Sequence, residues 1–344
     1  MESHRFKKTV LFPVSVIVPM RNSSTTILHT LKSISDQRFP IKEIIVVDNV
    51  SSDNSIEIVE EYKKNSRISI NIIKRKENKG VGASYNLGVR DATSSYVIFM
   101  HSDSSLPTRS EIRKLTEPLR KDLRVVASYP KVILPEKVWD SYNFWQKCLF
   151  ARSVGKESPG MNGKFDCVRR SMFLKVGGFD ETKFSGQYGF GGEDADLYLK
   201  LEKEGGIALS EAKVIHLHYL GSNYKLSNWI KNRKLLARTY GRLIRFQGMS
   251  LPIATHGMGL SLPLGAIIFM AKPFLAVLPL IPRLHILGII LLVLYTLMNS
   301  KKMYSTVSTL KNPRIFLLPF IDVFLVYYET FWMFEAFFFG RRRV

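Results

Sequence analysis

Residues 96–107 read YVIFMHSDSSLP, and residues 191–200 read GGEDADLYLK. The first stretch is a short apolar run that predicts a buried strand, with Asp103 directly after its end. In an open α/β sheet, the carboxyl ends of the strands are where a ligand or a metal binds. The second stretch places Glu193 and Asp194 at the start of a predicted helix, a position suited to a general base. Together they favour an enzyme that handles a nucleotide-activated substrate.

Further apolar runs on both sides of Asp103 alternate with helical patterns. Strands are predicted over residues 14–18, 41–47, 68–73, 96–100 and 125–129, and helices over residues 25–35, 80–90 and 110–121. This alternation predicts βαβ units, and therefore a Rossmann-like, mostly parallel sheet. Residues 139–168 mix aromatic residues with Gly and Pro, and we expect an irregular wall on the acceptor side rather than part of the sheet. Residues 1–222 form one predicted α/β domain.

Charge divides the chain into two regions. The whole sequence holds 50 Lys and Arg against 29 Asp and Glu, a net charge of +21. From Lys225 onward there are 16 basic and 3 acidic residues. Because long apolar runs interrupt these cations, we expect an anionic membrane surface and no nucleic acid as the partner. Cys148 and Cys167 lack metal-ligand spacing and are expected to be buried or incidental.

The basic region begins with a helical pattern. Within residues 223–249, apolar and cationic residues recur at three- and four-residue intervals on different faces, which predicts a basic amphipathic helix at a membrane interface. Residues 250–344 form the predicted C-terminal membrane region. Between residues 250 and 300 the only charged residues are Lys272 and Arg283. That stretch is long enough for about two spans of roughly twenty residues.

A third apolar segment, residues 315–339, contains Asp322, Glu329 and Glu335. Carboxylates are costly in a lipid core, so we expect this segment to lie flat or to re-enter. The basic residues 301–302 and 341–343 favour the cytoplasmic side. The short apolar run after the N-terminal residues does not indicate a signal peptide. We therefore predict attachment to the cell membrane, with the catalytic domain on the cytoplasmic side.

Five motifs occur in a characteristic order. They are VSVIVPMRN at 14–22, IIVVDNVSSDNS at 44–55, ENKGVGASYNLG at 77–88, GGFDE at 177–181 and the acidic pair at 193–194. With the loop around Asp103, this set resembles the inverting glycosyltransferases of family 2, in a membrane-attached form. The resemblance covers about residues 12–220 and implies a GT-A fold.

The resemblance also implies a donor site for a nucleoside-diphosphate sugar. The residues carried over to this site are Pro19, Arg21, Asp48, Asp53, Gly80, Asn86 and Ser102. Asp48 follows a predicted strand and can accept hydrogen bonds from a base or a ribose. Asp53 precedes an apolar-periodic helix, so N-terminal capping is an equally good interpretation. The glycines of residues 80–88 are explained equally well by packing against the sheet.

The metal motif of the family usually reads Asp-x-Asp, whereas this chain has His101-Ser102-Asp103. The resemblance implies that Asp103 binds Mg²⁺ or Mn²⁺. His101 either contacts the donor, favours manganese or packs under the loop. His216 and His218 alternate in an extended segment and therefore share one face, so either is a candidate third ligand; we favour His218. Satisfied core histidines are the plainer interpretation.

By the same resemblance, Asp194 is the catalytic base and Glu193 orients the loop or the acceptor. The predicted function is sugar transfer, with inversion, to a hydroxyl of a lipid-linked or membrane-proximal glycan. One alternative is a polyprenyl-phosphate monosaccharide synthase, similar to dolichol-phosphate-mannose synthase, whose anionic acceptor needs no base. Another is a degenerate donor-binding scaffold, because the first metal acid is missing. Assembly as a homo-oligomer is left open.

Overall fold

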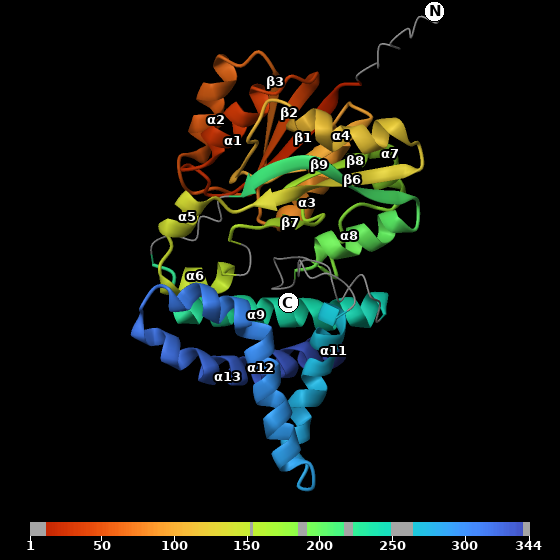
Figure 1. Ribbon diagram of the computed structural model, residues 1–344. Helices are drawn as coiled ribbons and strands as arrows, with labels where there is room; N and C mark the ends of the chain where they lie inside the picture. The colour runs from red at the N-terminus through yellow and green to blue at the C-terminus, as the bar shows by residue number, and fades with distance from the viewer. Residues whose placement is uncertain (1–11, 152–153, 185–190, 217–222, 249–263, 340–344) are drawn as a thin grey trace, which may run out of the picture.

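The computed structural model describes residues 12–151, 154–184, 191–216, 223–248 and 264–339. The upper part is one mixed α/β domain, and helices from the C-terminal third lie below it (Figure 1). The strands of the domain are β1 Val14–Met20, β2 Ile41–Asp48, β3 Ser69–Lys74, β4 Tyr96–Met100, β5 Ser104–Ser105, β6 Val125–Ile133, β7 Glu157–Pro159, β8 Phe165–Arg169 and β9 Gly206–His216. Its helices are α1 Ile27–Ser35, α2 Ser55–Lys64, α3 Val81–Asp91, α4 Glu111–Lys121, α5 Glu136–Asp140, α6 Phe144–Phe150, α7 Arg170–Lys175 and α8 Glu193–Glu202.

The strands form one sheet in the order β3-β2-β1-β4-β8-β6-β9-β5, with β7 paired to β6. Strands β3, β2, β1 and β4 are parallel, as the alternating pattern predicts. The predicted α/β class is confirmed, but the sheet is mixed: among the described residues, four strand pairs are parallel and four are antiparallel. Strand β6 extends to Ile133, beyond the predicted end at residue 129.

One prediction is wrong. Residues 139–168 were expected to form an irregular wall, but residues 165–168 belong to β8, which lies in the middle of the sheet and is antiparallel to both β4 and β6. Pairing on both edges satisfies the backbone of this segment although it lacks a regular apolar alternation. The prediction failed because tertiary pairing outweighs a weak local pattern.

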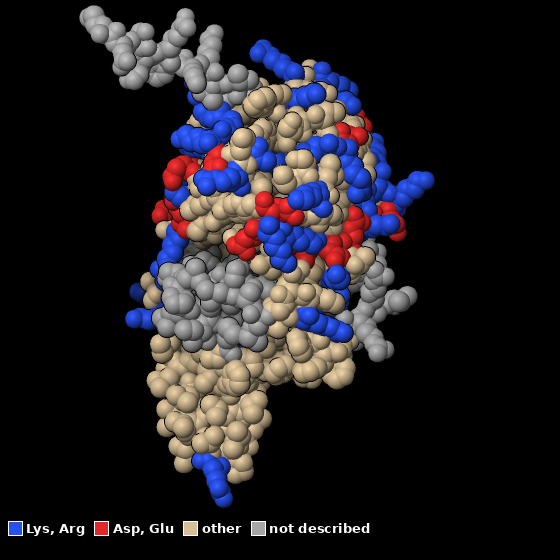
Figure 2. All heavy atoms as spheres, turned by 90° about the vertical axis from the view of Figure 1, so that its right-hand side faces the viewer, with Lys and Arg blue, Asp and Glu red and all other residues tan. Residues whose placement is uncertain are grey.

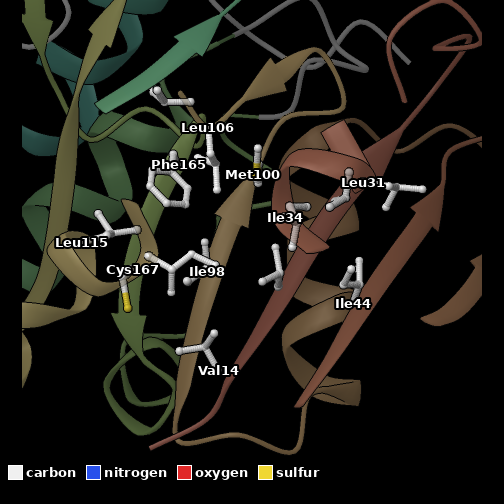
Figure 3. Close-up of a cluster of buried hydrophobic side chains, with 14 of the residues drawn as sticks. Val14, Leu31, Ile34, Ile44, Ile98, Met100, Leu106, Leu115, Phe165 and Cys167 are labelled. Carbon is white, nitrogen blue, oxygen red and sulfur yellow. The ribbon is translucent and has the colours of Figure 1, made fainter. Parts of the chain in front are cut away.

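The core lies on both faces of this sheet. Figure 3 shows one face, where Leu31 and Ile34 of α1 pack beside Val14, Ile44 and Ile98 of three adjacent strands. Both cysteines are buried and free, as expected. Such packing fixes the ends of the strands, where the polar motifs lie.

The C-terminal third is helical. Its helices are α9 Leu226–Gln247, α11 Leu264–Val277, α12 His285–Ser308 and α13 Leu318–Phe338, with short 3₁₀ turns at Leu278–Leu280 and Pro313–Leu317. Helices α11 and α12 form a hairpin that points away from the α/β domain, while α13 lies beside α9 (Figure 1). Figure 2 shows charged side chains gathered over the α/β domain and few over the helices below, apart from Lys or Arg at the far tip.

Within the part of the chain that the structure describes, two helical segments are long and apolar enough to cross a membrane: His285–Ser308 and Pro313–Phe338. At about 1.5 Å per residue, α12 is long enough for a hydrocarbon core of about 30 Å. Several cations of α9 face α13: Arg233 is paired with Glu329, and Arg238 lies 3.1 Å from Glu335. The predicted interfacial helix therefore has a protein partner along much of its length.

Candidate active site

Three side chains that suit a metal lie together at the strand ends. His101 follows β4, Asp103 precedes β5, and His216 ends β9, where it is paired in register with Ser104. Nε2 of His216 lies 3.0 Å from Oδ1 of Asp103, and Nδ1 of His101 lies 3.8 Å from the same oxygen. All three ligand atoms lie within 4.8 Å of one another. The short β5–β9 pairing is therefore what brings this group together.

Both imidazoles of this group are neutral at neutral pH. Burial, followed by the nearby His216 and Lys164, lowers the pKa of His101 to about 3, although 28% of its side chain is open to the site. Burial also lowers the pKa of His216, against the hydrogen bond and negative charge of Asp103. A neutral imidazole offers a lone pair to a metal. Two nitrogens and one carboxylate suit Mn²⁺ better than Mg²⁺, which prefers oxygen ligands alone.

His218, the other candidate ligand, lies outside the described residues.

A cleft of about 330 Å³ opens beside this group. Its walls come from five regions of the chain: α3, the strand ends, the segment after α7, the start of α8 and one face of α9. The lining residues are Val81, Tyr85, His101, Asn162, Gly163, Lys164, Phe179, Gly191, Gly192, Glu193, Asp194, Ala195, Leu235, Leu236, Thr239, Tyr240 and Leu243. The cleft therefore joins one member of the metal group, His101, to the candidate base, Asp194.

The acidic pair begins α8, where negative charge is stabilised by the helix dipole. Burial and the adjacent Asp194 raise the pKa of Glu193 well above the ordinary range of a glutamate. Oδ1 of Asp194 accepts a hydrogen bond of 2.9 Å from the N–H of Ala195. Adjacent carboxyl groups in different environments divide acid and base roles between them. Burial and the neighbouring carboxylate therefore favour the protonated form of Glu193.

Helix α9 holds the start of α8 in place, a role that sequence reasoning missed. The hydroxyl of Thr239 accepts a hydrogen bond of 3.0 Å from the N–H of Gly191. Gly192 has φ +95°, and a Cβ there would lie 2.7 Å from Cγ2 of Thr239. Only glycine allows both this backbone conformation and this close approach. The two glycines before the acidic pair therefore serve the docking of α9.

The loop at residues 162–164 is a second feature that sequence reasoning missed. Oδ2 of Asp166 accepts hydrogen bonds from the N–H groups of Asn162 at 2.9 Å and Gly163 at 2.5 Å, and the hydroxyl of Tyr85 donates to the oxygen of Gly163 at 2.6 Å. This loop presents Lys164 to the cleft. Burial lowers the pKa of Lys164, while Asp194, Asp166 and Asp103 oppose that shift. Lys164 thus lies within electrostatic reach of both the metal group and the candidate base.

Several of the predicted donor residues gather at the ends of β1 and β2. Asp48 is buried, and both its carboxylate oxygens accept from the N–H of Ser51, at 3.2 and 3.3 Å. Pro19 is buried within β1, whereas Arg21 is exposed just beyond it. The hydroxyl of Ser102 lies 2.8 Å from that of Ser23. The loop after β1, which contains Ser23, and the loop of residues 101–103 are therefore in contact, as a shared donor site requires.

Two other predicted donor residues, Asp53 and Asn86, have structural partners. Oδ1 of Asp53 accepts from the hydroxyl of Ser55 and from its N–H at 3.1 Å, and Oδ2 accepts from the N–H of Ser24 at 3.1 Å. Burial raises the pKa of Asp53, but these hydrogen bonds, with that of the Ser55 hydroxyl first, outweigh it and lower the pKa to about 2. The amide of Asn86 is bonded to both backbone groups of Phe179 and to Glu181. Gly80 immediately precedes α3, with φ +86°. Asp53 and Asn86 thus tie loops together, and their contact with a donor stays a prediction.

Comparison with known proteins provides independent evidence. Residues 15–176 match the family model described as Glycosyl transferase family 2. Poly-beta-1,6-N-acetyl-D-glucosamine synthase of Staphylococcus epidermidis is 33% identical over 91 residues, which is 26% of this chain and 22% of that protein. The putative glycosyltransferase EpsE of Bacillus subtilis is 25% identical over 268 residues, 76% of this chain and 88% of that protein. The first of these matches thus spans less than a quarter of the relative's length.

Among solved structures, the mannosyltransferase PcManGT from Pyrobaculum calidifontis, in complex with GDP-Man and Mn²⁺, superposes with a TM-score of 0.56. The match covers 97% of this chain and 89% of that protein at 17% sequence identity. At this identity the likeness shows the fold alone. The GT-A fold expected from the sequence motifs is therefore confirmed.

Proposed function

Because this chain carries a glycosyltransferase family 2 domain with the GT-A fold, we propose that it is a membrane-attached, inverting transferase of sugar from a nucleoside diphosphate to a glycan hydroxyl. The acceptor is a lipid-linked or membrane-proximal glycan. The observation that supports this most is the single cleft that joins His101 of the metal group to Asp194. Donor and base must meet across one sugar for an inverting transfer.

Asp194 is the group that removes the proton from the acceptor hydroxyl, on the side of the sugar away from the leaving diphosphate. Glu193, protonated beside it, leaves Asp194 as the anion of the pair and donates a hydrogen bond to the acceptor or the loop. Lys164 balances negative charge between the donor and acceptor sides of the cleft. Leu235 and Leu236 exclude water from the wall of the cleft that α9 forms.

His101, Asp103 and His216 would hold a divalent cation, and Mn²⁺ fits their donor set best. Such a cation, when bound, offsets the negative charge that develops on the departing nucleoside diphosphate. The PcManGT structure contains Mn²⁺ with a nucleotide sugar, which agrees with this choice. The Asp48 and Arg21 region at the ends of β1 and β2 would bind the nucleotide.

Membrane attachment is supported by the apolar helices and by the place of α9. One face of α9 lines the cleft, and the opposite side packs on α13, which is long and apolar enough to cross a membrane. The cleft therefore lies one helix away from the apolar C-terminal region. We propose that the catalytic domain lies at the cytoplasmic face of the cell membrane, where a lipid-linked acceptor is concentrated.

The test is a thermal-shift screen of the purified chain with nucleoside-diphosphate sugars and MnCl₂, followed by transfer assays with the sugar that binds. Binding is expected with MnCl₂ and lost with EDTA, and D103N should bind Mn²⁺ more weakly. Transfer that survives D194N with a polyprenyl phosphate acceptor would favour the monosaccharide synthase. A chain that binds a donor but never turns it over would be the scaffold.

A further inference from the structure

A groove lies among the C-terminal helices, outside the cleft just described. It has a volume of about 680 Å³ and is bounded by α9, α11 with the turn after it, and α13. Its lining residues are all apolar: Gly241, Ile244, Pro273, Phe274, Val277, Leu278, Ile281, Met333, Phe334, Phe337 and Phe338. Such a surface offers no side-chain hydrogen bond to a peptide backbone, which would be costly to bury there. A hydrocarbon chain is the ligand that this lining fits.

The groove and the catalytic cleft share α9 as a common wall. Tyr240 and Leu243 line the cleft, whereas Gly241 and Ile244, the next residue along in each case, line the groove. Successive residues of a helix differ by about 100° around its axis, so both hollows lie at the same level of α9. A helix with its side chains is about 10 Å across. One ligand can therefore place its head in the cleft and its tail in the groove.

The width of the groove is set by close packing of α9 on α13. A Cβ at Gly241 would lie 2.2 Å from the backbone oxygen of Met333. The two helices are thus in contact at one edge of the groove, and α11 forms the other edge. Phe274 and Phe338 are 73% and 60% exposed, so large apolar side chains remain uncovered along it. An uncovered apolar surface of this kind marks a site of binding or of membrane contact.

Cations gather at the same end of α9. The nitrogen of Lys183 and the guanidinium carbons of Arg242 and Arg245 lie 5.3 to 5.5 Å from the ring centre of Phe246. Lys183 and Arg245 are exposed, so they are accessible to an anion. A phosphate between the head and the tail of a lipid-linked acceptor matches this charge.

We propose that the groove binds the isoprenoid tail of a lipid-linked acceptor whose phosphate lies near Lys183 and Arg245 and whose glycan enters the cleft. The proposal rests on the proposed function and names its acceptor class. Only a ligand with one long tail and an anionic, glycan-bearing head uses the groove, the cations and the cleft together.

The test uses the full chain in detergent micelles and a C55 prenyl phosphate that carries a diazirine in its tail. After irradiation, labelled peptides are mapped by mass spectrometry. Labels are expected in residues 273–281 and 333–338, reduced by unlabelled prenyl phosphate and not by phosphatidylglycerol. V277W, which fills the groove, should lower labelling at least about fivefold. I286W is the matched control, because Ile286 is apolar, 73% exposed and does not line the groove.

Equal competition by phosphatidylglycerol would reduce the groove to a general lipid contact and overturn the proposal. Labelling absent from both segments, or unchanged by V277W, would overturn it as well. Release of nucleoside diphosphate by donor hydrolysis is measured in parallel, because it needs the cleft and not the groove. If the wild type never releases it while the labelling is specific, the proposed function fails and the tail site stands.

Discussion

Replacing Asp166 by Asn is expected to change how stability depends on pH. Asp166 is 1% exposed, and its Oδ2 accepts the two N–H groups that shape the loop before Lys164. Within the described residues, its Oδ1 has no hydrogen-bond partner. Burial raises the pKa of Asp166 from 3.8 to about 7. The native protein therefore keeps a proton on Asp166 in a range where the unfolded chain has lost it.

The sign follows from this difference. Between about pH 4 and pH 7 the native state binds one more proton than the unfolded state, so Asp166 makes stability fall as pH rises. Three pKa units correspond to at most about 4 kcal/mol. His101 acts in the opposite direction, because its lowered pKa makes stability rise with pH up to about 6.5. The wild-type curve mixes these effects, and the difference between D166N and wild type isolates Asp166.

The assay is thermal unfolding in detergent with EDTA, at pH 5, 6, 7 and 8. The melting temperature of D166N minus that of wild type is expected to increase from pH 5 to pH 8 by about 5 °C, because the assay covers about two of the three pKa units, or about 3 kcal/mol, at roughly 2 °C per kcal/mol. D166A serves as a control, since it leaves two buried N–H groups unpaired at a cost of about 1–3 kcal/mol each at every pH. Parallel curves for D166N and wild type would refute the reasoning, because Asp166 would then be ionised throughout.

Three further substitutions test the site and its support. D194N should lower the transfer rate by roughly 10²–10⁴-fold without weakening nucleoside diphosphate binding, whereas a loss of binding alone would contradict its role as a base. G192A should lower the free energy of unfolding by about 2–4 kcal/mol, because its backbone is left-handed and its Cβ would be crowded. The control G155A, at φ +66° in open space, should lower it by only about 1 kcal/mol. Equal melting temperatures for the two variants would contradict the proposed close packing. E329Q should destabilise by about 3–5 kcal/mol because it removes a buried carboxylate shared by two cations, Arg233 and Lys272. E335Q should cost about 1 kcal/mol or less, because the side chain of Glu335 is 24% exposed and pairs with one cation.

The parallel half of the sheet was predictable from the sequence because each of its strands can be recognised from its own residues alone. Residues 41–47 are rich in Ile and Val and end at Asp48, and the observed strand extends by one residue to include it. Buried parallel strands require continuous apolar runs of this kind. The same argument placed Asp103 and Asp194 at element ends, where the structure has them. Local composition was sufficient wherever one element could be recognised alone.

The missed features depend on contacts between distant segments. Strand β8 contains Asp166 among apolar residues, and it is a strand because β4 and β6 pair with its two edges. Lys164 has no signal of its own, since its place in the cleft comes from the bonds that Asp166 and Tyr85 make to the preceding loop. The one available hint was a charged pair, Lys164 and Asp166, flanking an aromatic residue between a glycine and an apolar run. That hint does not specify a cleft.

The basic residues of α9 have partners inside the protein, and the same helix lines the cleft. Its basic composition indicated a membrane surface, yet Arg233 and Arg238 pair with α13, and Thr239 holds the glycines before Asp194. Carboxylates are costly in an apolar helix such as α13, and the arginines of α9 offset this cost by pairing with them. Helix α13 packs along α9, and α9 is in turn one wall of the cleft. Helix α9 therefore contacts both the apolar helix α13 and the start of α8, and it joins the wall of the cleft to the apolar helices in one packed unit.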